Sequence, residues 1–261
     1  MTIPDNPAAA EPPERARDAN LLVETWLAAA TLTLWPLSRQ RINASTDHRG
    51  RAMVFVPIFG FLLGIAAALI DHATAPLHSL PLRSAIVILA LAAATRLMHL
   101  SGFARTIEAL VRGVKTSGSE LGIVGTLAAI LIVVLEVICL SVIAAPRARA
   151  QAIVLATMLS RWAIVPIGYG LRPLDSWGLG IPYNGGIRFR EFAVGSVIAL
   201  GIAMSLYDIV ALAAIVVLAL AILGLRLLFS RRLGGASGYA LAGGAAVCEL
   251  LVFAILAMLR I

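Results

Sequence analysis

The polar segment from Met98 to Leu110 holds the residues of this chain that are best suited to chemistry. It lies between two long apolar stretches and contains His99, Arg105 and Glu108. A histidine can donate hydrogen bonds at neutral pH, a carboxylate can act as a general base, and a guanidinium binds phosphate oxygens in pairs. We therefore predict that His99 and Glu108 are candidate catalytic residues in a site for a phosphate-bearing substrate.

All three residues also have a purely structural interpretation. Arg105 and Glu108 are three positions apart, which is the spacing of an ion pair within one helix. His99 fits equally well as an interfacial histidine with satisfied hydrogen bonds. The sequence alone leaves both alternatives open.

Further arginines lie in or beside the apolar runs. Arg161 follows Ser160 inside one run, Arg172 precedes Pro173, and Arg232 begins the turn that leads to Tyr239. Charged residues at membrane depth are costly and are usually functional or paired. Because converging guanidinium groups suit an anionic ligand, we predict that Arg161, Arg172 and Arg232 bind phosphate. The alternative for Arg161, and for Glu249 in the last apolar run, is an ion pair with another helix.

The elements that must position these residues are membrane-spanning helices. The chain has 261 residues, of which 60% are hydrophobic and 13% charged, and its mean hydropathy is +0.94. Soluble domains have about 45–50% apolar and about 25% charged residues. The net charge of +7 comes from arginine, with Lys115 as the only lysine. No basic face interleaved with aromatic residues is present, so we predict no nucleic-acid partner.

The sequence predicts an all-α fold, a polytopic integral membrane helix bundle of about seven to eight helices. Residues 1–20 are predicted to be a disordered N-terminal tail without a signal peptide, and residues 21–261 a single transmembrane helical domain. Weaker candidates for spans are residues 21–37, which could instead lie in the interface, and 191–206. The clear candidates are residues 52–70, 83–100, 121–145, 151–170, 208–229 and 239–259.

Loop charges predict the orientation of the bundle. The connections 38–51, 101–120, 171–190 and 230–238 are rich in arginine, whereas 71–82 contains neither Lys nor Arg. The positive-inside rule therefore places the basic connections, and with them the candidate site, on the cytoplasmic face. Arg147 and Arg149 in the connection 146–150 are an exception to the pattern. Gly60 and Gly64 have the spacing of a close helix contact in lipid.

Several short motifs, in order, resemble those of the cobalamin synthase family, the adenosylcobinamide-GDP ribazoletransferases. The family's F-x-P-x-x-G-x-x-x-G stretch is matched by residues 55–64, and its H-L-D-G-L-A-D-T-A-D-G-L motif by residues 99–110. Its K-D-S segment is matched loosely by residues 115–117, its Ser-Arg pair by residues 160–161, and its R-L-G-G-x-T-G-D motif by residues 232–239.

The resemblance implies a multi-pass enzyme of the bacterial inner membrane that acts in coenzyme B12 biosynthesis. Such an enzyme joins adenosylcobinamide-GDP to α-ribazole, or to its phosphate, and releases GMP. It also implies Mg²⁺ held by clustered aspartates, with Glu108 as the remaining candidate ligand, and roles for Lys115 and Ser117 in substrate binding. Membrane lipids are further expected partners, and the sequence is compatible with a homo-oligomer.

The chain departs from the family pattern at the aspartates themselves. Only one of the replacements, Glu108, is a carboxylate, and Arg105 puts a positive charge where a metal ligand is expected. The alternative prediction is therefore a catalytically inactive relative that acts as a membrane scaffold or regulator, with a small transporter as a third hypothesis. The replacements are Ser101, Arg105, Glu108, Thr116 and Tyr239.

Overall fold

The computed structural model describes residues 50–113, 121–174 and 187–259. These residues form helices and one isolated bridge, between Pro173 and Ala236, and contain no strand, which confirms the all-α prediction. The predicted tail 1–20 and the segment 21–37 lie outside the described residues. The α-helices are α3 (Val56–Ala73), α4 (Leu80–Ala94), α5 (Met98–Arg112), α6 (Ile123–Val142), α7 (Pro146–Gly168), α8 (Phe189–Leu228) and α9 (Gly238–Met258). Short helical turns cover Met53–Phe55 (η2), Ala75–Leu77 (η3) and Phe229–Leu233 (η4).

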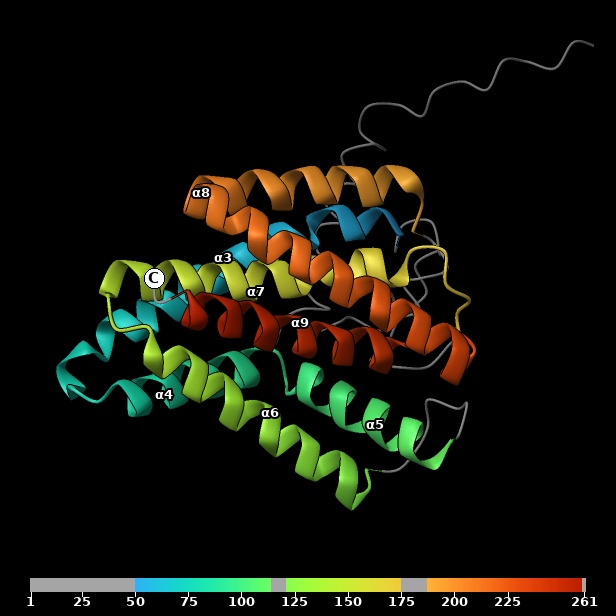
Figure 1. The fold of residues 1–261 in the computed structure, drawn as a ribbon, viewed down its shortest axis with the longest axis horizontal. Helices are drawn as coiled ribbons and strands as arrows, with labels where there is room; N and C mark the ends of the chain where they lie inside the picture. Colours follow the sequence, from blue (N-terminus) through green and yellow to red (C-terminus); the bar gives the residue numbers. More distant parts are fainter. Residues whose placement is uncertain (1–49, 114–120, 175–186, 260–261) are drawn as a thin grey trace, which may run out of the picture.

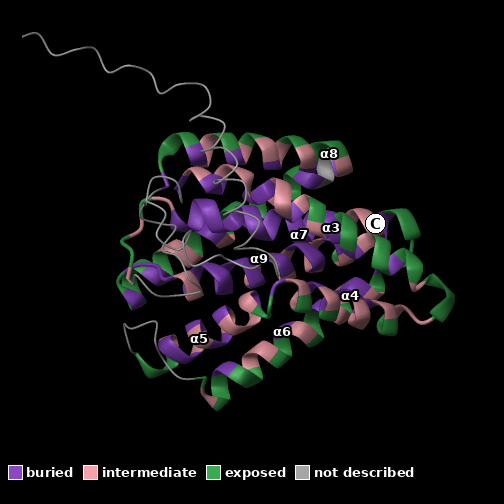
Figure 2. Cartoon of the chain, turned by 180° about the vertical axis from the view of Figure 1, so that it is seen from behind, coloured by how far each residue is buried: buried purple, intermediate pink, exposed green. Residues whose placement is uncertain are grey.

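The described helices form a membrane bundle around α7 (Figure 1). In the described residues, six segments are long and apolar enough to span a bilayer: 50–73, 123–142, 146–168, 189–207, 211–233 and 238–258. In α7 89% of the spanning window is buried, against 22% in α6 (Figure 2). α7 is therefore the central helix, and the lipid-facing helices surround it.

The helix α8 contains the two spans predicted at 191–206 and 208–229. The helix has two arms, and each arm is a separate membrane-spanning segment. The first arm covers 189–207, and the second arm, together with η4, covers 211–233. Figure 1 shows them folded back on each other. Each arm is about 28–35 Å long at 1.5 Å per residue, which matches the hydrocarbon thickness of a bilayer. The prediction of two spans here is confirmed.

The helix predicted over 83–100 is not continuous, because it is broken after Ala94. α4 ends at Ala94, and α5 leaves it at an angle of 84°. Arg96 and Leu97 adopt positive φ angles of 53° and 58°, and the Leu97 amide donates to the Ala92 carbonyl at 2.7 Å. Residues 101–112, predicted as part of the connection 101–120, belong instead to the amphipathic helix α5, because burying one face against α9 favours a helix over a loop.

Close glycine contacts join the helices that frame the site. A Cβ on Gly64 would lie 2.8 Å from the Val154 Cα, and one on Gly60 would lie 3.0 Å from the Met158 Cα. The predicted close packing through Gly60 and Gly64 is thus confirmed, with α7 as the partner. Gly243 of α9 meets the backbone of α5 in the same way, at 2.9 Å from the Phe103 Cα. Small residues let helix backbones approach closely where no hydrophobic effect drives packing.

One of the two arginines that break the charge pattern, Arg149, has a structural role, whereas Arg147 is exposed. Arg149 is fully buried and donates to the Asp71 carboxylate at 2.8 Å, to the Ser84 hydroxyl at 2.9 Å and to the Leu140 carbonyl at 2.6 Å. Arg83 binds the second Asp71 oxygen at 2.7 Å. Arg149 therefore ties α3, α4, α6 and α7 together and does not act as an exposed loop charge.

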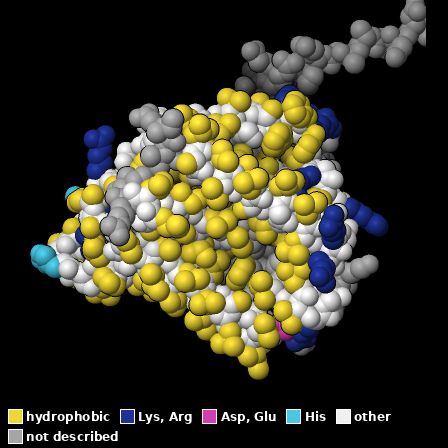
Figure 3. Space-filling view, in the orientation of Figure 1, with side chains coloured by type: hydrophobic (Ala, Val, Ile, Leu, Met, Phe, Trp, Pro, Cys, Tyr) yellow, Lys and Arg dark blue, Asp and Glu magenta, His cyan; other side chains and the backbone are white. Residues whose placement is uncertain are grey.

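The opposite end of the bundle is rich in exposed arginine. This basic end is where α7 finishes and where α6, α8 and α9 begin. Figure 3 shows most Lys and Arg side chains at the right edge of the molecule, where Figure 1 places the start of α9. The exposed arginines here are Arg112, Arg172, Arg188, Arg190, Arg231 and Arg232.

Candidate functional site

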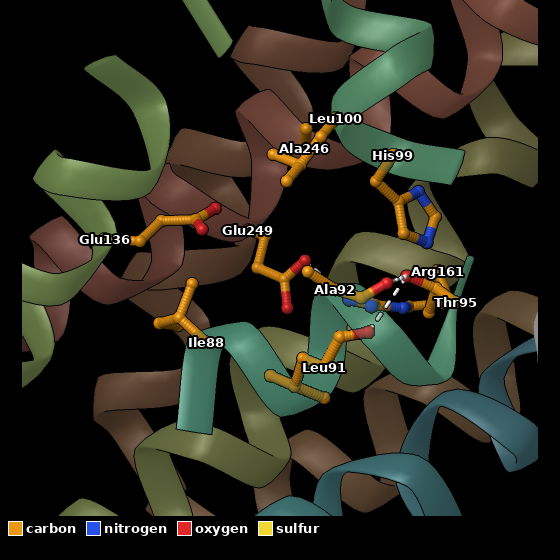
Figure 4. A pocket seen from close by; sticks show the side chains of 10 residues that line it. All are labelled: Ile88, Leu91, Ala92, Thr95, His99, Leu100, Glu136, Arg161, Ala246 and Glu249. Atoms are coloured by element: carbon orange, nitrogen blue, oxygen red, sulfur yellow. Dashed lines mark hydrogen bonds and ion pairs between the residues drawn. The ribbon is translucent and has the colours of Figure 1, made fainter. Parts of the chain in front are cut away.

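The first half of α5 faces a buried polar cavity. His99 lines it together with Thr95 from the break after α4, Glu136 of α6, Arg161 of α7 and Glu249 of α9. Figure 4 shows Glu136, Glu249 and His99 reaching into this space from three different helices. All five side chains are buried, and Arg161 is only 1% exposed. The break between α4 and α5 thus brings His99 to the centre of the bundle.

The ion pair of Arg161 and Glu249 is the main contact in this cavity. Arg161 Nη1 donates to Glu249 Oε2 at 2.6 Å and to the Ser160 hydroxyl at 2.7 Å. Arg161 Nε, Glu249 Oε1 and both ring nitrogens of His99 are buried without a hydrogen-bond partner among the described residues. Unsatisfied buried groups cost about 1–3 kcal/mol each, so a further hydrogen-bond partner in the cavity would stabilise them.

The size of the cavity limits what that partner can be. Its volume is about 20 Å³, whereas a water molecule needs about 10–15 Å³. One ordered water fits, and it would meet the polar atoms that it needs. A nucleotide does not fit in this conformation. His99 and Arg161 therefore lie together at a water-sized site between the helices, and their substrate contacts remain a prediction.

Glu108 lies at the other end of α5 and supports α6. It is 3% exposed, and its Oε2 accepts a hydrogen bond of 2.9 Å from the Gly125 amide, in the first turn of α6. Its Oε1 accepts a bond of 2.7 Å from Arg112 Nε. A carboxylate at a helix N-terminus satisfies an amide that lacks a partner within its own helix. Glu108 therefore acts as a cap supplied by a neighbouring helix.

The ion-pair partner recorded for Glu108 is Arg112, four positions along α5, whereas the structural alternative in the sequence was Arg105. The guanidinium carbon of Arg105 lies 4.8 Å from the centroid of the Tyr239 ring at the start of α9. This is a cation–π contact, worth about 0.5–2 kcal/mol depending on its exposure. Both residues stand at positions where the family pattern has aspartate.

These contacts decide whether the described residues fit Mg²⁺. The ion prefers several hard oxygen ligands, which here would come from carboxylates. Each oxygen of Glu108 already accepts a hydrogen bond. Arg105 brings a positive charge, which repels the metal ion, to the same helix face. The described part of the chain contains no group of three or more His, Cys, Asp or Glu residues that could hold a metal. The residues around Glu108 therefore do not fit Mg²⁺.

The two catalytic candidates are too far apart to act on one atom. His99 and Glu108 are nine residues apart on one helix, or about 13 Å at 1.5 Å per residue. Of the predicted phosphate-binding residues, Arg172 and Arg232 are exposed at the basic end. The Ala236 amide donates to the Arg172 carbonyl at 2.9 Å, which joins the two loops. Lys115 and Ser117 lie outside the described residues.

Sequence reasoning missed Glu136 and Thr95. Glu136 is the only carboxylate in α6, and a lone acidic residue in an apolar span was a usable signal. Thr95 could not be found in this way, because its place in the cavity depends on the end of α4.

Comparisons with known proteins give a consistent result. The model of the cobalamin-5-phosphate synthase family matches residues 24–258. A protein of Escherichia coli (strain UMN026 / ExPEC) named adenosylcobinamide-GDP ribazoletransferase is 29% identical over 232 residues, which is 85% of this chain and 93% of the relative. Proteins of the same name from Shigella boydii serotype 4 and Shigella flexneri have the same identity and coverage. No solved structure matches the chain.

Proposed function

Because the chain belongs to the cobalamin-5-phosphate synthase family, a family of cobalamin-biosynthesis transferases, we propose that it acts at the ribazoletransferase step. In this proposal it binds adenosylcobinamide-GDP and α-ribazole, or the phosphate of α-ribazole, and joins them with release of GMP. The relatives from Escherichia coli and Shigella carry the name of this activity. The match over nearly the whole chain is the observation that carries the proposal.

The basic end provides the groups that would hold the substrate. Arg172 and Arg232 are exposed, and the hydrogen bond between the loop of Arg172 and Ala236 keeps the two loops together. Two guanidinium groups on adjacent loops can hold a pyrophosphate through paired hydrogen bonds. The N-terminus of α9 lies beside them and adds a partial positive charge. In this arrangement Arg172 and Arg232 orient the bond between the two phosphates.

The orientation follows from the same charges. Six exposed arginines lie at the basic end, and the positive-inside rule puts such an end on the cytoplasmic side. We place the chain in the bacterial inner membrane with the substrate site facing the cytoplasm, where nucleotide-activated compounds are made.

A second candidate function is favoured by one contact. Arg105 stacks on Tyr239 at the place where the family pattern has two aspartates. The residues of that site now hold α5 and α9 together. The chain would then be a non-catalytic relative that keeps the fold as a scaffold or regulator, and binds the substrate without converting it.

A transfer assay distinguishes the two functions. The purified protein in lipid vesicles is mixed with adenosylcobinamide-GDP, α-ribazole and Mg²⁺, beside a family member with intact aspartates. Release of GMP together with cobalamin formation supports the transferase, and absence of turnover beside a working control rejects it. Substrate binding that weakens about tenfold in Arg232→Gln, but not in Arg147→Gln at the opposite end, supports the proposed site in either case.

A further inference from the structure

A second hollow lies on the membrane side of the bundle, away from α5. It is an apolar groove of about 290 Å³ between the end of α7 and the two arms of α8. Its volume is just below the usual range of small-molecule sites, about 300–1,000 Å³. The groove is therefore too small for a cobinamide nucleotide. Its lining includes Pro166, Tyr169, Phe192, Ala219, Leu223 and Arg226.

The groove has one polar end, formed by Arg226. Arg226 Nη1 donates to the carbonyl oxygens of Pro166, Ile167 and Tyr169, the last carbonyls of α7 and its first loop residue. This cation stabilises the C-terminus of α7 through the helix dipole. The contacts recorded for Arg226 use Nη1 alone, so Nε and Nη2 retain donors for another ligand.

The position of Arg226 fixes the direction of the groove relative to the membrane. The guanidinium binds the last carbonyls of α7 and therefore lies level with the end of that span, and we take this level as the membrane interface. Ala219 is seven residues earlier in the same helix arm, about 10 Å deeper in the membrane. The groove therefore begins with a cation at the interface and continues as an apolar channel along the membrane normal.

One part of the groove wall is aromatic. Tyr169 and Phe192 stack with ring centroids 5.3 Å apart. Aromatic rings gather at the level of the headgroups in membrane proteins. A charged donor, an aromatic wall and an apolar channel together match the parts of a phospholipid.

We propose that this groove is a binding site for one glycerophospholipid. The phosphate binds Nε and Nη2 of Arg226, and an acyl chain lies in the channel beside Ala219 and Leu223. A guanidinium donates two parallel hydrogen bonds to phosphate oxygens, which gives the site its preference for this group. The proposal does not depend on the transferase activity.

Native mass spectrometry of the full chain tests the proposal. The protein is released from nanodiscs of dioleoylphosphatidylglycerol, and the fraction that retains one lipid is measured. Ala219→Phe fills the channel and leaves Arg226 in place, and we expect about tenfold weaker retention. Leu220→Phe is the matched control, because Leu220 is 66% exposed and lies outside the groove, and it should retain lipid as the wild type does.

Arg226→Gln gives an independent result. Its lipid retention should also be about tenfold weaker. Its melting temperature should no longer rise when phosphatidylglycerol is added. If Arg226→Gln does not fold, Ala219→Phe still decides the question. Equal lipid retention by Ala219→Phe and Leu220→Phe would overturn the proposal. A wild-type protein that is released without lipid would also overturn it, and would indicate that another segment of the chain fills the groove.

Discussion

The guanidinium of Arg105 lies 4.8 Å from the centre of the Tyr239 ring, and this contact joins α5 to the start of α9. The two residues come from motifs more than 130 positions apart, and each replaces an aspartate of the family pattern. A guanidinium and an aromatic face attract each other directly. In the family pattern, two aspartates would be held together by the metal ion that they share. The two replacements are therefore compatible with each other, because the cation–π contact takes the place of a contact through a shared metal ion.

This relationship predicts the response to magnesium. The wild-type protein should show no Mg²⁺-dependent rise in melting temperature. The variant Ser101→Asp/Arg105→Asp/Tyr239→Asp, which restores three carboxylates beside Glu108, should gain one. Saturation at a hundred times the dissociation constant stabilises a protein by about 2.7 kcal/mol. Thermal unfolding in detergent with and without Mg²⁺ measures the difference.

Tyr239→Phe is the control for this experiment, because it keeps the ring face and adds no carboxylate. It should behave as the wild type does. A wild-type protein that binds Mg²⁺ as the triple variant does would show that ligands outside the described residues hold the ion, and would contradict the prediction.

The capping role of Glu108 predicts a loss of stability on substitution. Glu108→Ala leaves the buried Gly125 amide without a partner and should lower the free energy of unfolding by about 1–3 kcal/mol. Arg112→Ala should cost less than about 1 kcal/mol, because the Arg112 side chain is 50% exposed and exposed ion pairs contribute little. Unfolding by denaturant in mixed micelles measures both values. A larger loss for Arg112→Ala than for Glu108→Ala would argue against the cap.

The contact of α3 with α7 predicts that one methyl group is enough to disturb the core of the bundle. Gly64→Ala would place a Cβ 2.8 Å from the Val154 Cα, and overpacking of this kind costs about 1–3 kcal/mol. Gly224→Ala is the matched control, since nothing lies within 4 Å of its Cβ. It should be neutral or stabilising by up to about 1 kcal/mol, because alanine favours a helix over glycine. Equal melting temperatures for the two variants would exclude a tight α3–α7 contact.

The spans were predictable from the sequence because the bilayer imposes a length and requires every backbone group to bond within the segment. Apolar runs near 52–70, 151–170 and 239–259 became α3, α7 and α9 with small shifts at the ends. Even the two arms of α8 followed from length alone. The contact of Gly60 and Gly64 was also predictable, because small residues four positions apart mark a helix interface.

The break at Thr95 was not predictable, because no Gly or Pro marks it. Arg96 and Leu97 both adopt positive φ, which is unfavourable for a residue with a side chain. Packing of the apolar face of α5 against α9 compensates for this local cost. A contact between segments far apart in sequence thus decided the direction of the chain, and no local pattern contains that information.

The partners of the charged residues were predictable only in kind. A buried arginine needs an anion, but the sequence does not choose among Asp71, Glu136 and Glu249. The structure assigns Arg149 to Asp71 and Arg161 to Glu249. The same limit applies to Glu108, whose partner in α6 depends on where α5 meets that helix.

The pair of Arg161 and Glu249 gives a final prediction, which separates a structural role of Arg161 from a role in substrate binding. Both side chains are buried and are 2.6 Å apart. Removing one partner leaves an uncompensated charge, so Arg161→Met or Glu249→Met should each cost about 3–5 kcal/mol. The double variant removes both charges and should recover most of that loss, because apolar residues of similar volume can replace a buried pair. A double-mutant cycle by thermal unfolding measures the coupling, and additive losses would show that the pair is not coupled.

If the stable double variant still binds adenosylcobinamide-GDP as tightly as the wild type does, Arg161 is a structural residue. If it folds and has lost binding, the predicted phosphate contact of Arg161 is supported.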